Sequence, residues 1–113
     1  MSEPLDTLVV YVPRSGTEPL LGALFAAGAG AVGRYRECAF VGPGRGQFRP
    51  LPGADPAVGQ VGELERVEED RVEVVLPRRL RGSGVAAMRA AHPYEEPAFH
   101  VVEHASIPGP GEK

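Results

Sequence analysis

Several features that this sequence lacks restrict what the protein can be. Cys38 is the single cysteine among 113 residues, which excludes an intramolecular disulfide and any metal site built only from cysteines. No apolar run reaches the length that a membrane span requires. Residues 1–4 (MSEP) lack the basic start and the apolar block of a signal peptide. We therefore expect a cytoplasmic protein that has no membrane partner.

The sequence also lacks an excess of positive charge. Twelve Lys and Arg residues stand against 15 Asp and Glu residues, which gives a formal net charge of -3. Nucleic acids and anionic membranes are bound nonspecifically through a basic surface, so neither is an expected partner. What is present fits one small domain, because 42% of the residues are hydrophobic and 24% are charged.

The first part of the chain has the pattern of a strand followed by a helix. Residues 8–12 (LVVYV) are β-branched, aromatic or apolar, as expected for a strand deep inside a sheet, and Pro13 ends this run. Residues 15–18 (SGTE) have the spacing of a capping box, and apolar residues then recur at helical spacing. Glycine tolerates the left-handed conformation at the end of a helix, so we expect a positive φ at Gly28 or Gly30.

The middle of the chain predicts several short strands. Residues 50–59 contain three prolines and two glycines and predict a loop. Alternating apolar residues, bounded by glycine, proline and acidic pairs, suggest the other segments. These are a strand at 35–41, a tight turn at 42–46 (GPGRG), a short returning strand at 47–49, strands at 62–68 and 71–76, and a turn or bulge at 69–70.

The last part of the chain repeats the order of helix and strand. Ser83 can cap a second helix, which ends before His92 because Pro93 disfavours a helical conformation in the residue that precedes it. Residues 98–104 predict the last strand, and residues 106–113, rich in proline and glycine, are expected to form a disordered tail. Residues 5–105 are then one domain.

This order of elements predicts an α+β fold, a ferredoxin-like sandwich with a βαββαβ core and an extra hairpin. Both helices of such a sandwich cover one face of an antiparallel sheet, and the other face is left bare. Val102 and neighbouring apolar strand residues could line that bare face. We therefore expect the protein to bind copies of itself.

The segment at residues 92–97 (HPYEEP) is the most conspicuous candidate site. His92 with Glu95 or Glu96 could bind a divalent metal ion, because imidazole and carboxylate groups are metal ligands. The alternative is structural: the two prolines fix a turn, and His92 and Tyr94 pack and form hydrogen bonds that hold it. In that case Glu95 or Glu96 accepts hydrogen bonds from nearby backbone N–H groups. The sequence favours the structural role and leaves the metal site open.

Arg78, Arg79 and Arg81 form a second candidate site, just before the second helix. Arginines near a helix N-terminus could hold a phosphate or a carboxylate, and a solvated loop is the ordinary alternative. Together with Tyr94 they are the candidate ligand-binding residues for a small-molecule or anionic effector. We identify no catalytic residue, because no nucleophile stands beside a base in a recognisable arrangement, and an enzyme is the weakest class of function.

Several irregular segments together resemble one particular family. They are residues 11–13 (YVP), 27–35 (AGAGAVGRY), 44–50 (GRGQFRP), 53–59 (GADPAVG), 67–73 (VEEDRVE) and 92–98 (HPYEEPA), with Cys38 and Phe40 between the second and the third. This pattern is similar to the insert domain of the YqfO-type members of the Nif3-like family. The resemblance extends from about residue 7 to about residue 104.

The resemblance implies a domain shaped like the PII signalling proteins and CutA, which form trimers that meet through their sheets. It also implies that the dinuclear metal centre of the family belongs to the flanking Nif3 halves, so no cofactor is carried over to these residues. We expect a homotrimer, with a dimer as the alternative. The expected function is that of a non-catalytic regulatory or interaction module, with a small effector held at the subunit clefts. A CutA-like divalent metal-ion binding protein, using His92 with Glu95 or Glu96, is the alternative.

Overall fold

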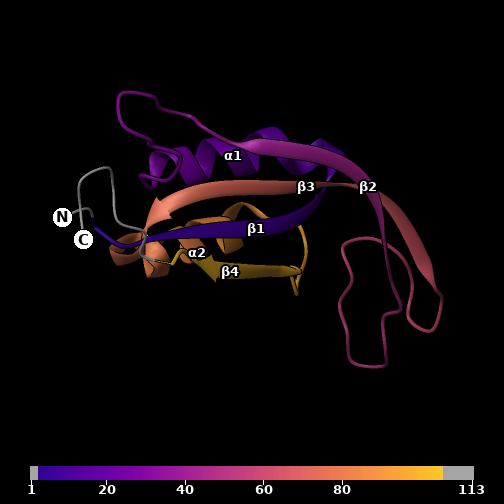
Figure 1. The fold of residues 1–113 in the computed structure, drawn as a ribbon. Helices are drawn as coiled ribbons and strands as arrows, with labels where there is room; N and C mark the ends of the chain where they lie inside the picture. Colours follow the sequence, from indigo (N-terminus) through magenta and orange to yellow (C-terminus); the bar gives the residue numbers. More distant parts are fainter. Residues whose placement is uncertain (1–2, 106–113) are drawn as a thin grey trace.

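The structure, a computed structural model, describes residues 3–105. Four strands form one antiparallel sheet in the order β2-β3-β1-β4, and helices α1 and α2 lie on the same side of it (Figure 1). The elements are β1 Leu5–Pro13, η1 Arg14–Gly16, α1 Thr17–Ala26, β2 Phe40–Phe48, β3 Glu65–Pro77, η2 Arg78–Leu80, α2 Arg81–Ala91 and β4 Phe99–Glu103, where η is a 3-10 turn. The predicted α+β sandwich is confirmed, and the predicted tail at 106–113 lies outside the described residues.

Strand β1 lies inside the sheet because its residues are apolar on both faces. Leu8, Val10 and Val12 point towards the helices and are at most 1% exposed, while Val9, on the opposite face, is 2% exposed. The register places Val10 between Val72 of β3 and Phe99 of β4. The remaining core side chains are Leu20, Leu21 and Leu24 of α1, Val74 and Leu76 of β3, and Met88 of α2. Each large side chain buried in this layer contributes roughly 1.5–3 kcal/mol.

Both helices begin differently from the prediction. Ser15 does not cap α1 but lies in the turn η1, and Gly16 occupies the cap position without a side-chain hydrogen bond. Ser83 lies inside α2, where its hydroxyl donates to the carbonyl of Leu80 at 3.2 Å. The reason is the same in both cases: each preceding strand ends in a proline, and a 3-10 turn then leads directly into the helix.

The end of α1 agrees with the prediction. Gly28 has φ +97° and Gly30 has φ +82°, values that a residue with a Cβ adopts only at a cost. The N–H of Ala29 donates to the carbonyl of Leu24 at 3.0 Å, which satisfies a carbonyl of the last helical turn. The N–H of Gly30 donates to the carbonyl of Val75 at 2.7 Å. Gly28 therefore follows the last residues of the helix, and Gly30 ties the chain to β3.

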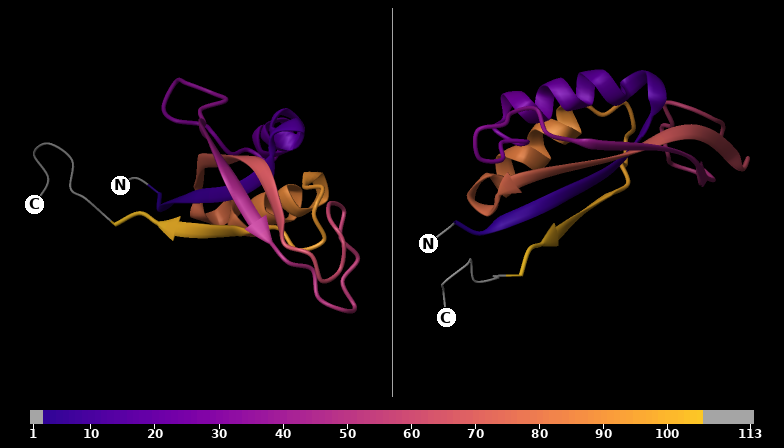
Figure 2. Two further views of the ribbon diagram at one scale, coloured as in Figure 1. Left: turned by 90° about the vertical axis from the view of Figure 1, so that its right-hand side faces the viewer. Right: turned by 45° about the horizontal axis from the view of Figure 1, so that its top comes forward.

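The strands of the β2–β3 hairpin are longer than predicted, and their bounds differ. Residues 42–46, predicted as a turn, and residues 47–48, predicted to return, belong to the single strand β2. Residues 69–70 likewise lie within β3 and make no turn. β2 tolerates Pro43 because it is at the edge of the sheet, where a proline N need not donate to a second neighbour. The hairpin and its loop, which includes the predicted loop at 50–59, extend beyond the helical layer (Figure 2).

No helix within residues 3–105 is both long enough and apolar enough to cross a membrane.

Candidate functional site

Within residues 3–105, no helix covers the face of the sheet opposite α1 and α2 (Figure 2). The register groups on this face Thr7, Val9 and Tyr11 of β1 with their partners on the neighbouring strands, which are Val75, Glu73, Arg71, Phe40, His100 and Val102. Phe40 is 65% exposed and Val102 is 47% exposed. A bare, partly apolar sheet face is what the sequence predicted. We refer to these nine residues as the open face.

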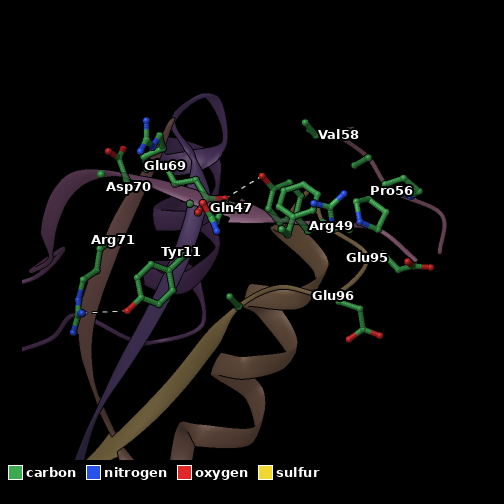
Figure 3. Close-up of a pocket in the computed structure, with 18 of the residues that line it drawn as sticks. Tyr11, Gln47, Arg49, Pro56, Val58, Glu69, Asp70, Arg71, Glu95 and Glu96 are labelled. Carbon is green, nitrogen blue, oxygen red and sulfur yellow. Dashed lines mark hydrogen bonds between the residues drawn. The ribbon is translucent and has the colours of Figure 1, made fainter. Parts of the chain in front are cut away.

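A cavity of about 720 Å³ lies where the open face meets the β2–β3 hairpin (Figure 3). Its floor is the alternate glycines of β2, namely Gly42, Gly44 and Gly46, and the register pairs Gly44 with Glu69 of β3. A Cβ on Gly46 would collide with the Glu69 carboxylate, whereas a Cβ on Gly44 would meet nothing within 4 Å. The walls are Tyr11, Phe48, the hairpin loop around Pro56 and Val58, and the segment that contains Tyr94.

The cavity was not anticipated from the sequence, because the GPGRG run at residues 42–46 was interpreted as a turn. The feature of the sequence that could indicate the cavity is the spacing of the glycines. Glycine at every second position of a strand leaves one face of that strand without side chains. Gly42, Gly44 and Gly46 have this spacing, and the cavity occupies the space that side chains would fill.

Glu69 and Tyr94 form the most buried polar pair of the cavity wall. Glu69 is 9% exposed, and the Tyr94 hydroxyl donates to its Oε2 at 3.0 Å. The Tyr94 ring also packs against Phe48 at 5.6 Å between centroids, with a tilt of 63°. Burial, and then the hydrogen bond to Glu69, raise the pKa of Tyr94 well above its ordinary value. The hydroxyl therefore remains a donor to Glu69 across the physiological range.

His92 holds the HPYEEP segment to the end of β1. Its Nε2 lies 2.7 Å from the carbonyl oxygen of Tyr11, to which it donates, and its Nδ1 accepts from the N–H of Tyr94 at 3.1 Å. Both nitrogens of this buried ring are therefore engaged with the backbone, which favours the structural role. Within residues 3–105, no three His, Cys, Asp or Glu side chains come together in a way that could hold a metal ion.

The two glutamates of the segment lie at the rim of the cavity. The Oε1 of Glu95 accepts from the backbone N–H of Asp55 at 3.2 Å, which ties the HPYEEP segment to the hairpin loop. This is the backbone contact that the sequence suggested for one of the two glutamates. Glu96 is exposed, and both carboxylates lie apart from Glu69 (Figure 3). The structure thus does not bring Glu95 and Glu96 together with the His92 ring nitrogens.

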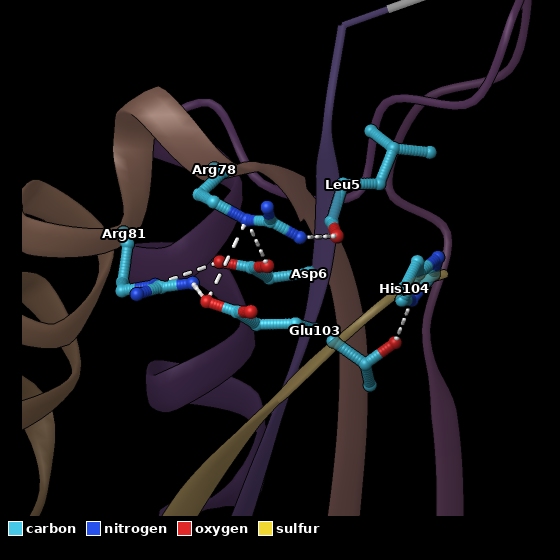
Figure 4. A network of polar contacts seen from close by, with 7 residues as sticks. Leu5, Asp6, Arg78, Arg81, Glu103 and His104 are labelled. Atoms are coloured by element: carbon cyan, nitrogen blue, oxygen red, sulfur yellow. Dashed lines mark hydrogen bonds and ion pairs between the residues drawn. The ribbon is translucent and has the colours of Figure 1, made fainter. Parts of the chain in front are cut away.

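The three candidate arginines lie at the other end of β1, where carboxylates of the same chain bind them (Figure 4). Arg78 and Arg81 each direct Nε to one oxygen of Asp6, at 2.8 Å in both cases. Arg81 also contacts Glu103 at 2.5 Å, and Arg79 pairs with Glu3 at 2.9 Å. Tyr94 lies near Tyr11 instead, so the four residues predicted to hold an anion do not form one site.

Asp6 is the buried centre of this ionic cluster and has no exposed surface. The hydrogen bond from Arg81 lowers the pKa of Asp6; burial acts in the opposite direction, and the hydrogen bond from Arg78 lowers the pKa further. The hydrogen bond to Asp6, together with that to Glu103, raises the pKa of Arg81. The cluster joins the start of β1 to the start of α2, and its role is to hold these elements together.

The sequence of this chain is similar to one segment of several longer proteins. A "GTP cyclohydrolase 1 type 2 homolog" of Mycobacterium bovis is 55% identical over 106 residues, which are 94% of this chain and 27% of that protein. The protein of the same name from Bacillus subtilis is 47% identical over 100 residues, which are 88% of this chain and 27% of its own length. The chain thus spans about a quarter of these relatives, and their name describes the longer proteins. No family profile matches the sequence.

Among solved structures, this chain is again similar to one segment of a longer protein, and it also shares its fold with smaller proteins. A Bacillus cereus protein related to NIF3 superposes with a TM-score of 0.80 at 40% identity, over 94% of this chain and 27% of that one. CutA1 from Oryza sativa superposes with a TM-score of 0.68 at 15% identity, over 95% of this chain and 85% of that one. The periplasmic divalent cation tolerance protein CutA from Archaeoglobus fulgidus gives a TM-score of 0.63 at 15% identity, over 87% and 81% of the two chains. At such identities the likeness to CutA concerns the fold alone.

Proposed function

We propose, from the homology of this chain to a segment of the Nif3-like GTP cyclohydrolase 1 type 2 homologs, that it is a non-catalytic module that self-associates and binds a small effector. The open face is the proposed surface of self-association, and a cytoplasmic homotrimer is the assembly that the resemblance to PII and CutA proteins implies. The cavity beside the open face is the proposed effector site.

The observation that carries this proposal is the continuity of the open face with the cavity. Tyr11 and Arg71 belong to the open face, and both also line the cavity. A second copy of the chain packed on the open face would therefore stand next to the cavity mouth. In a closed symmetric assembly the equivalent cavities would lie at equivalent subunit boundaries. Occupancy of the cavity could then influence the assembly, which is what a regulatory module requires.

The apolar content of the open face supports self-association. Phe40 and Val102 expose large parts of their side chains, and a shallow depression of about 260 Å³ between Thr7, Phe40 and Val75 could receive a side chain. Removing such surface from water contributes about 25 cal/mol per Å². The helical layer cannot supply the cover, because it is already packed on the other side of the sheet.

The polar groups around the cavity support binding more than chemistry. His92 and Glu95 are engaged with the backbone, and the Tyr94 hydroxyl is engaged with Glu69. Each of these hydrogen bonds fixes a wall of the cavity, and none pairs a nucleophile with a base. A preformed concave site with a few fixed polar groups is the usual form of a small-molecule binding site.

Two measurements test the proposal: the molecular mass of the protein in solution tests self-association, and a screen of small molecules tests binding in the cavity. Light scattering during size exclusion at micromolar concentration should give a multiple of the 12.0 kDa chain mass. A library of small molecules should contain compounds that raise the melting temperature of the wild type more than that of Gly44→Leu, because the new side chain would project from the cavity floor, where no atom stands within 4 Å of its Cβ. A strictly monomeric mass, or a melting response that is identical in the two proteins, would contradict the proposal.

A further inference from the structure

The cavity wall combines a buried carboxylate with aromatic and apolar side chains, and this combination suits one class of ligand. We propose that the cavity binds a small organic cation, an ammonium or guanidinium group on an aromatic or apolar body, with the cationic group against Glu69. This inference rests on the proposed function only in taking the cavity as the effector site. It adds the sign of the charge and the residue that recognises it.

The first step concerns Glu69, whose carboxylate is the buried charge of the cavity wall. It is 9% exposed, and among residues 3–105 no Arg, Lys or His forms an ion pair with it. One oxygen accepts from Tyr94, and the other lies over Gly46, so close that a Cβ there would collide with it. Burying a carboxylate without a cation is unfavourable. A cationic ligand on the cavity floor would supply the missing partner.

The second step concerns the aromatic side chains around this carboxylate. Phe48, Tyr94 and Tyr11 all line the cavity, and Phe48 and Tyr94 pack edge to face. The faces of aromatic rings attract cations. An apolar or aromatic ligand body would also find apolar contacts with Phe48 and with the loop residues Pro56 and Val58, which line the same cavity. The same walls thus suit both parts of the proposed ligand.

The third step concerns the arginines of the cavity, which would otherwise favour an anion. Arg71 pairs with Glu73 at 2.9 Å and donates to the Tyr11 hydroxyl at 3.1 Å. Arg49 donates to the carbonyl of Gly62 at 2.7 Å. Arg45 is exposed at the rim. The positive charges are therefore engaged elsewhere or lie at the edge, whereas the negative charge of Glu69 is buried in the cavity wall.

The experiment compares two probes that share one body and differ in charge, phenethylammonium and 3-phenylpropionate. Calorimetry at neutral pH should detect phenethylammonium binding to the 113-residue chain and little binding of 3-phenylpropionate. Glu69→Gln keeps an oxygen that can accept from Tyr94 and should weaken phenethylammonium binding about tenfold or more. Glu63→Gln removes an exposed carboxylate from the hairpin loop, outside the residues that line the cavity, and should leave the affinity within about twofold.

Gly44→Leu provides a second variant in case Glu69→Gln perturbs the fold. It should weaken binding of phenethylammonium while Glu69 remains in place, because Gly44 pairs with Glu69 and the new side chain would project into open space beside that residue. The inference is overturned if 3-phenylpropionate binds as tightly as phenethylammonium, if neither probe binds, or if Glu69→Gln leaves binding unchanged in a folded protein. An anion that binds the wild type but not Gly44→Leu would overturn the inference and leave the proposed function standing.

Discussion

His92 joins two segments of the chain through both nitrogens of its ring. It donates to the carbonyl of Tyr11 and accepts from the N–H of Tyr94. His92→Ala would leave that carbonyl buried without its donor, which costs about 1–3 kcal/mol. We expect a loss of unfolding free energy of this size in urea denaturation, and no change beyond about 0.5 kcal/mol in the exposed control Glu96→Gln.

The same variant tests the alternative in which His92 binds a divalent metal ion. The wild type titrated with zinc should show no stoichiometric site that depends on His92, because the ring nitrogens are already engaged. A submicromolar site that disappears in His92→Ala while the stability is unchanged would contradict the structural role and restore the metal-binding alternative.

Asp6 gives a prediction for the pH dependence of stability. The hydrogen bond from Arg81, with that from Arg78, holds the pKa of Asp6 in the folded protein below its ordinary value of 3.8. The unfolded chain therefore binds a proton that the folded chain does not. The contribution of Asp6 is complete above the unfolded pKa and is lost as the pH falls through the folded pKa.

Urea denaturation between pH 5 and pH 2 should show this loss as a fall in unfolding free energy, because the loss begins near the unfolded pKa of 3.8 and continues below it. In Asp6→Asn the stability at neutral pH should be lower and the fall towards acid shallower. Asp55→Asn, which changes an exposed loop residue, should keep the acid slope of the wild type. An unchanged slope in Asp6→Asn would show that the cluster does not respond to acid through Asp6.

At the scale of elements, the segment that follows α1 and joins it to β3 contains a glycine that other residues can replace only at a cost. Gly30 has φ +82°, and a Cβ there would stand 2.9 Å from the Phe25 ring and 3.0 Å from the Cys38 carbonyl oxygen. Gly30→Val should lower the unfolding free energy by at least about 1–2 kcal/mol, the cost of the left-handed conformation alone. Gly22→Ala should instead raise it by about 0.5–1 kcal/mol, because Gly22 lies within α1 with nothing within 4 Å of a new Cβ. Equal effects of the two substitutions in thermal and urea denaturation would contradict this account.

The order and type of the main elements could be predicted because their signals are local. The apolar run of β1, the helical spacing before Gly28 and the effect of Pro93 on His92 all act within a few residues, and the structure confirms them. The GPGRG run shows why other parts could not be predicted. Its local preference is for a turn, but pairing with the thirteen-residue strand β3 prevails over that preference.

The candidate site could likewise be predicted only where its contacts are local in the sequence. HPYEEP was recognisable as a special segment, and the hydrogen bonds of His92 and Glu95 account for its composition. The pairing of Tyr94 with Glu69 joins residues 25 positions apart, and no short-range pattern indicates such a contact. Arg78 and Arg81 bind Asp6, more than 70 positions away, so a sequence pattern that suggested an anion site belongs to an ionic cluster within the chain.

At the scale of the whole molecule, a thin sheet with helices on one side leaves a large face exposed. The molecule extends 57 × 24 × 24 Å, and the open face runs from Val102 to Tyr11 beside the cavity. Isolated exposed apolar residues are common on soluble proteins, whereas the open face carries both Phe40 and Val102 in exposed positions on one side of the sheet. The central claim is that copies of the chain cover this face.

The most direct measurement is the mass of two matched variants by light scattering during size exclusion, over a range of micromolar concentrations. Val102 on the open face and Val61 in the hairpin loop are each 47% exposed. Val102→Glu should shift the mass towards that of the monomer, because a charge would be placed in the interface, whereas Val61→Glu should keep the oligomeric mass of the wild type. A wild type that is monomeric throughout, or a Val102→Glu variant that assembles like Val61→Glu, would contradict the account.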